Sequence, residues 1–63
     1  MKRYVEIRPF SGDESDPGFV RMKASSQHDA ERIERGANIN LNHDAYYTRI
    51  VETNDELPVV RMR

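Results

Sequence analysis

The side chains that could carry out acid-base, nucleophilic or metal chemistry are few in this 63-residue chain. Neither His28 nor His43 has a helical or hairpin spacing to Asp29 or Asp44 that would gather ligands for a metal ion. The serines do not lie in a strained nucleophile turn, and serine, histidine and acid do not follow the order of a known hydrolase. Cysteine is absent, which excludes a disulfide framework and a cysteine-ligated zinc. We therefore expect no catalytic residue, no metal site and no enzyme.

Composition narrows the class of protein further. Three glycines are too few for a loop that cradles phosphates, so no nucleotide or other cofactor is expected. Ten Lys and Arg residues against eleven Asp and Glu give a net charge of −1, which lacks the one-sided field of a free-standing nucleic-acid binder. Apolar runs are too short for a signal peptide or a membrane span, so we expect a cytosolic protein with no membrane partner.

Two segments, 2–10 and 19–24, alternate apolar and polar residues with the period of a strand that buries one face. The side chains expected in the core are Val5, Ile7, Val20, Met22 and Ala24. Those expected on the opposite face are Tyr4, Glu6, Arg8, Phe19, Arg21 and Lys23. Residues 11–18, "SGDESDPG", combine Gly, Pro, Ser and three acids, which predicts a hairpin loop between the strands.

A helix is predicted directly after the second strand. Ser26 followed by Asp29 matches the serine-plus-acid pattern of a capping box, so the helix should begin near Gln27. The side chains on its apolar stripe are Ala30, Ile33 and Ala37. We expect the helix to end near Gly36 to Asn38, although Leu41 continues the stripe and the helix could run through Gly36 at a cost of about 1 kcal/mol.

The remaining residues predict the second half of a small sheet. Residues 38–44, "NINLNHD", read as a connector whose Ile39 and Leu41 tuck under the sheet edge. Residues 45–53 are rich in aromatic and β-branched types and predict a third strand, and 57–62 predict a short fourth strand that Pro58 confines to an edge. The fold class is then α+β, one domain over 1–63: a three- to four-stranded antiparallel sheet, β-β-α-β-β, in the order 2-1-3-4, with one helix packed on one face.

A single helix would leave the other sheet face open to a partner. The aromatic and basic side chains expected there are Tyr4, Phe19, Arg21, Lys23, Tyr47 and Arg49. Aromatic residues and arginine are favoured at protein interfaces, and the same mixture can stack on single-stranded nucleic acid. A third interpretation is that these residues only support cross-strand pairing in a solvated sheet.

The segments "MKRYVEI", "MKASSQHDAERI" and "YYTRIVET" resemble, in order and spacing, small phage anti-CRISPR proteins that inhibit type I-F surveillance complexes. The pattern is also similar to the small RNA-polymerase inhibitor of T7-like phages and to DpnD/PcfM-like proteins of mobile elements. The anti-CRISPR resemblance implies a binder that occupies a basic surface for guide RNA on the backbone subunits, with Arg32 at a basic helix position of that family. At Glu31 and Gly36, where the family has basic residues, this chain departs from it.

These observations predict a phage or mobile-element inhibitory binding protein in the cytoplasm of the host cell. It would sterically block a host protein or nucleoprotein complex, with a type I CRISPR surveillance complex favoured over RNA polymerase. The predicted partner-binding residues are Tyr4, Arg21, Lys23, Arg32, Tyr47 and Arg49. The alternatives are a small nucleic-acid-binding or regulatory module and a self-associating protein, so the chain would be a monomer or a weak homodimer.

Overall fold

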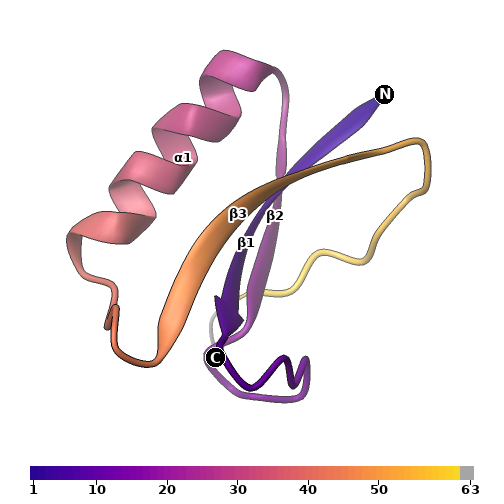
Figure 1. Cartoon of the computed structure of the whole chain (residues 1–63). Helices are drawn as coiled ribbons and strands as arrows, with labels where there is room; N and C mark the ends of the chain where they lie inside the picture. The colour runs from indigo at the N-terminus through magenta and orange to yellow at the C-terminus, as the bar shows by residue number, and fades with distance from the viewer. Residues whose placement is uncertain (62–63) are drawn as a thin grey trace.

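The computed structural model describes residues 1–61 and, within them, shows a three-stranded antiparallel sheet with one helix on one face (Figure 1). Along the chain the elements are β1 Lys2–Pro9, β2 Val20–Ala24, α1 Gln27–Ile39 and β3 Tyr46–Thr53. Their order in the sheet is β2-β1-β3, with β1 in the centre. The small α+β fold is therefore confirmed, and these four elements begin and end within one or two residues of the predicted positions.

The main core lies between α1 and the sheet. Val5 stands opposite Met22 of β2 and Ile50 of β3, so the three side chains share the face that α1 covers. Val5 packs with the buried Ala24 and with Ala30 from the helix, and Ile33 and Ile50 close the cluster. The apolar side chains predicted from the alternation of the strands and from the helical stripe thus pack together on one side of the sheet.

The helix begins at its predicted cap and runs longer than expected. Asp29 N donates to Ser26 Oγ at 3.1 Å, while the Asp29 carboxylate accepts from the backbone N of Ser25, one residue before the usual capping-box partner. The helix continues through Gly36 to Ile39, so the expected end near Gly36 to Asn38 is too early. Ile39 is 76% exposed at the last turn, and the expectation that it tucks under the sheet edge is wrong.

Replacing Gly36 by alanine is expected to stabilise the fold by about 0.5–1 kcal/mol. Gly36 lies inside α1, and a Cβ there would meet nothing within 4 Å, so the substitution gains helix propensity without a clash. Urea unfolding of the two chains measures the difference. A G36A chain no more stable than the parent would indicate that α1 ends before Gly36 in solution.

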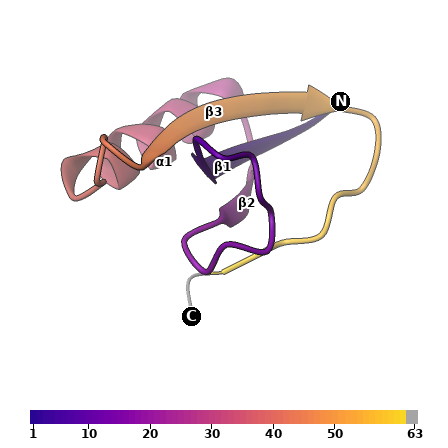
Figure 2. The ribbon, with the colours of Figure 1, turned by 60° about the horizontal axis from the view of Figure 1, so that its bottom comes forward.

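The predicted fourth strand does not form beside β3, and the order 2-1-3-4 is not confirmed. Residues 54–61 instead cross the sheet face that α1 leaves free and reach the far edge (Figure 2). There Val60 forms a single bridge with Arg21 of β2, with N–O distances of 2.8 and 3.0 Å. Pro58 has no N–H to extend this pairing into a ladder. Met62, which closes the predicted strand, lies outside the described residues.

Because of this crossing, the sheet face opposite α1 is largely covered, and the expectation of an open face is wrong. Leu57 N donates to the hydroxyl of Tyr4 at 3.1 Å, which fixes the crossing segment over one end of the face. The hairpin loop between β1 and β2 folds over the other end. Tyr4, Phe19 and Arg21, all expected on the open face, are buried.

Candidate interaction surface

A buried carboxylate organises the middle of the face opposite α1. Glu6 on β1 stands directly between Arg21 of β2 and Arg49 of β3 in the register, and only 1% of it is exposed. Its Oε2 accepts from Arg21 Nε at 2.7 Å, and its Oε1 accepts from Arg49 Nε at 2.9 Å and from Arg8 Nη1 at 3.0 Å. Three guanidinium groups thus converge on one carboxylate, and we call this set the Glu6 cluster.

Burial alone would raise the pKa of Glu6, but hydrogen bonds from Arg21, Arg49 and Arg8 outweigh it and hold the pKa below its ordinary value of 4.5. The carboxylate is therefore charged in the folded protein at neutral pH. Its role is structural, because both carboxylate oxygens accept hydrogen bonds from arginines of the same chain.

The lowered pKa of Glu6 predicts loss of stability in acid. A group with a depressed folded-state pKa stabilises the fold above its unfolded value, near 4.5, and this contribution disappears as pH falls through the lower folded-state pKa. The stability difference between the parent chain and a Glu6→Gln variant should therefore shrink as pH is lowered from 6 to below 4. Urea unfolding at several pH values measures it, and a constant difference would contradict the prediction.

Two of these arginines, Arg8 and Arg21, pack against the aromatic ring of Phe19. The guanidinium carbons of Arg8 and Arg21 lie 5.3 and 5.1 Å from the centroid of Phe19, within the range of cation–π contact. Glu14, on the hairpin loop, adds a carboxylate 3.3 Å from Arg8 Nη2 and 3.7 Å from Arg21 Nη2. Phe19 and Glu14 together leave little of the two guanidiniums in contact with water.

The hairpin loop is also attached to β3. Tyr46 Oη donates to Asp16 Oδ1 at 2.8 Å, and this hydrogen bond, together with burial, raises the pKa of the Tyr46 phenol. Asp16 Oδ1 also accepts from Gly18 N at 2.7 Å. A Cβ at Gly18 would come within 2.5 Å of the Tyr46 ring, so the absence of a side chain lets ring and loop approach. The base of the loop is thereby fixed to the sheet.

An aromatic and basic patch remains exposed beside the Glu6 cluster, formed by Phe10, Tyr47 and Arg49. Phe10 is 63% exposed, and its ring centroid lies 5.3 Å from that of Tyr47 at an interplanar angle of 31°. Arg49, two residues along β3 on the same face, has half of its side chain exposed. Phe10 N donates to Ala45 O at 3.1 Å, which fixes the backbone beneath the first ring. We refer to these residues as the Phe10 patch.

The predicted partner-binding residues lie in four places. Tyr47 and Arg49 meet in the Phe10 patch, whereas Tyr4 and Arg21 are buried and present no surface. Lys23 is exposed on β2, 3.8 Å from Glu56. Arg32 is exposed on α1, across the sheet from the patch, and pairs with Asp29 at 2.9 Å.

Phe10 was missed by sequence reasoning, because it is the last residue of the first predicted strand, after Pro9, and was assigned to neither face of the sheet. Its position between Pro9 and the polar residues 11–18 was the available signal. An aromatic residue at the edge of a turn with no place in the predicted core is a candidate for surface contact.

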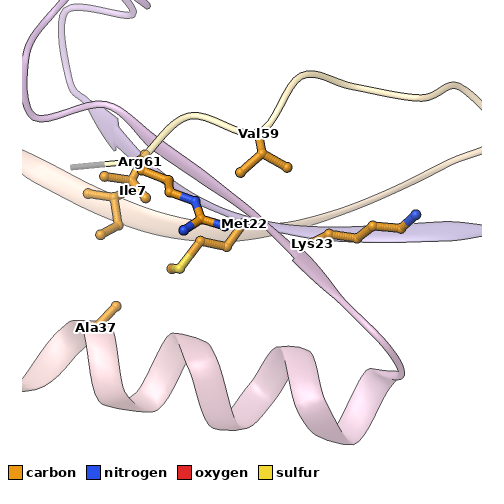
Figure 3. Close-up of a pocket in the computed structure, with 7 residues that line it drawn as sticks. Ile7, Met22, Lys23, Ala37, Val59 and Arg61 are labelled. Carbon is orange, nitrogen blue, oxygen red and sulfur yellow. The ribbon is translucent and has the colours of Figure 1, made fainter. Parts of the chain in front are cut away.

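A groove lies at the β2 edge of the sheet, between α1 and the C-terminal segment that ends beside β2. It has a volume of about 530 Å³ and is open to solvent, and Figure 3 shows Ala37 of the helix facing Ile7 and Met22. Its other lining residues are Val20, Lys23, Val59 and Arg61.

Among residues 1–61, no three histidine or acidic side chains lie close enough together to hold a metal ion. Over this range, α1 is neither long nor apolar enough to cross a membrane.

Comparisons with protein-family models, with curated proteins and with solved structures found no match for this chain.

Proposed function

We propose that this chain is a phage or mobile-element binding protein that sterically blocks a host nucleic-acid-handling complex through the Phe10 patch. The observation that carries the proposal is the exposed ring of Phe10 against the partly exposed ring of Tyr47, beside the half-exposed Arg49. Tyrosine, phenylalanine and arginine are the residue types that contribute most at the centres of protein interfaces. The choice of a type I CRISPR surveillance complex, ahead of RNA polymerase, rests on the resemblance of "MKASSQHDAERI" and "YYTRIVET".

The surroundings of the patch support binding without chemistry. Arg49 is oriented by Glu6 at 2.9 Å, and Tyr47 lies on the same strand, so these two side chains are presented by the rigid part of the fold. A surface that is ordered before binding loses less conformational entropy when the complex forms. Steric blocking requires only such a surface, which suits a chain of this size.

A charge placed in the patch is expected to weaken partner binding. Phe10→Asp removes an exposed ring and should weaken the complex by about 2 kcal/mol or more, which is roughly thirtyfold in Kd. The measurement is capture of type I CRISPR subunits, or of RNA polymerase, from the host lysate by the tagged chain, followed by binding to the purified complex. Phe10 makes few contacts within its own chain, so the fold should remain intact.

Ile39→Asp is the matched control, because it introduces the same charge at another exposed apolar residue, at the end of α1. Arg32→Glu tests the helix position that the resemblance favours. Equal loss with Phe10→Asp and Ile39→Asp would refute the patch as the binding surface. Loss with Arg32→Glu alone would move the interface to the helix.

A second candidate function is binding of single-stranded nucleic acid, favoured by the stacked rings of Phe10 and Tyr47 next to a guanidinium. Binding dominated by phosphate contacts falls steeply as salt rises, whereas a mixed protein interface responds less. Fluorescence anisotropy with a labelled oligonucleotide from 50 to 300 mM salt separates the two. Patch-dependent oligonucleotide binding with a steep salt slope would favour this second function.

A further inference from the structure

We propose that Arg8 and Arg21 form a binding site for a phosphate monoester, and that Glu14 occupies this site from within the chain. The inference concerns the buried side of the Glu6 cluster, not the Phe10 patch, and does not depend on the proposed function. Glu6 fixes the two guanidiniums on one side, and the carboxylate of Glu14 contacts both of them from an exposed loop.

The two guanidiniums are already arranged as an oxyanion site. Arg8 Nη2 and Arg21 Nη2 both point at the same oxygen, Glu14 Oε2, at 3.3 and 3.7 Å. Both side chains are mostly buried, and other atoms hold them: Glu6 binds them at 3.0 and 2.7 Å, and Phe19 packs against both. Arginines fixed in this way lose little entropy when a ligand binds, and their planar donors match phosphate oxygens.

The positive charges of the Glu6 cluster outnumber the negative charges of Glu6 and Glu14. Within residues 1–61, Arg8, Arg21 and Arg49 bring three positive charges to the cluster, and Glu6 and Glu14 bring two negative ones. The Glu14 contacts are longer than the roughly 2.7–2.9 Å of a good charge-assisted hydrogen bond. If Glu14 swings away, two positive charges remain uncompensated in a poorly hydrated place.

The two uncompensated positive charges favour a ligand that carries close to two negative charges. A phosphate monoester carries about −1.5 to −2 at neutral pH and offers three acceptor oxygens, so it neutralises the cluster more completely than Glu14 does. A free carboxylate or a phosphodiester carries a single negative charge. Neither should displace Glu14, because the tethered carboxylate acts at a high effective concentration.

Glu14 can leave without disturbing the loop. Its side chain is 56% exposed, and its contacts in the described chain are the two arginines. The loop is fixed at other residues: Asp16 binds Tyr46 Oη, and Gly12 N donates to Pro9 O at 3.0 Å. Displacement therefore requires rotation of one side chain and not refolding of the loop.

The test compares Glu14→Gln with Asp13→Asn. Both remove one negative charge from the same loop, but Asp13 accepts from Ser15 and does not contact the arginines. Inorganic phosphate and O-phosphoserine are titrated into each chain at pH 7.5 and constant ionic strength, and the Nε–H resonances of Arg8 and Arg21 are followed by NMR. We expect saturable shifts in the parent, about tenfold tighter binding by Glu14→Gln, and no tightening by Asp13→Asn.

Acetate and dimethyl phosphate distinguish the ligand class and should shift neither resonance. Arg8→Lys in the Glu14→Gln background should lose the gain in affinity, with a melting curve to show that the chain remains folded. Equal affinities of Glu14→Gln and Asp13→Asn would overturn the site, as would resonances that do not respond to phosphate. Tight binding of dimethyl phosphate would overturn the assignment to a monoester.

Discussion

Replacing Glu6 by glutamine is expected to destabilise the fold by about 3–5 kcal/mol, the cost of removing one partner from a buried charge cluster. Glutamine keeps the shape of the side chain but leaves Arg8, Arg21 and Arg49 facing one another without the central negative charge. Since a domain of this size is marginally stable, this loss should move the urea midpoint of the variant far below that of the parent chain. Urea unfolding followed by circular dichroism provides the measurement.

Glu14→Gln is the control for this experiment, because it removes the same charge from the rim of the same cluster. Its carboxylate is more than half exposed, so the change should cost less than about 1 kcal/mol. If the two variants were equally stable, the Glu6 cluster would be no more than a solvated ion network. Because each variant removes one negative charge, the difference in their free energies of unfolding measures the effect of burying the carboxylate.

The strands and the helix were predictable because each follows a local pattern. Val5 and Ile7 alternate with polar residues, and Ser26 with Asp29 marks the start of α1. The same alternation correctly placed Glu6 and Arg21 on one face. It did not show that they stand directly opposite each other, because that depends on the register between strands.

The path of residues 54–61 could not be predicted in the same way. These residues form one bridge and no ladder, so they have no period that reports which face they cover. Their length and Pro58 favoured a short edge strand beside β3. Contacts made only in three dimensions, such as Leu57 N on Tyr4 Oη, decide instead that they cross the sheet.

This error explains the outcome for the candidate site. An open face predicts Tyr4 and Arg21 as binding residues along with Tyr47 and Arg49. The crossing segment and the hairpin loop bury the first two and leave the second two beside Phe10. Residue type alone therefore does not decide which of these side chains a partner could reach, because the covering segments determine which of them are exposed.

The second large effect is expected at Tyr4, which joins the covering segment, residues 54–61, to the sheet. Tyr4 is fully buried, and Tyr4→Ala should cost about 3–5 kcal/mol from lost burial and the cavity left behind. Tyr4→Phe keeps the ring and removes only the acceptor for Leu57 N, so it should cost about 1 kcal/mol. Urea unfolding compares the two variants.

Hydrogen exchange separates the two roles of Tyr4. In Tyr4→Phe, the amide of Leu57 should exchange faster, because its acceptor is gone, while the amides that pair β1 with β3 should keep their protection once the change in global stability is subtracted. Unchanged exchange at Leu57 would show that residues 54–61 do not rest on Tyr4 in solution. In that case the face opposite α1 would be open after all, and the buried part of the surface would become available to a partner.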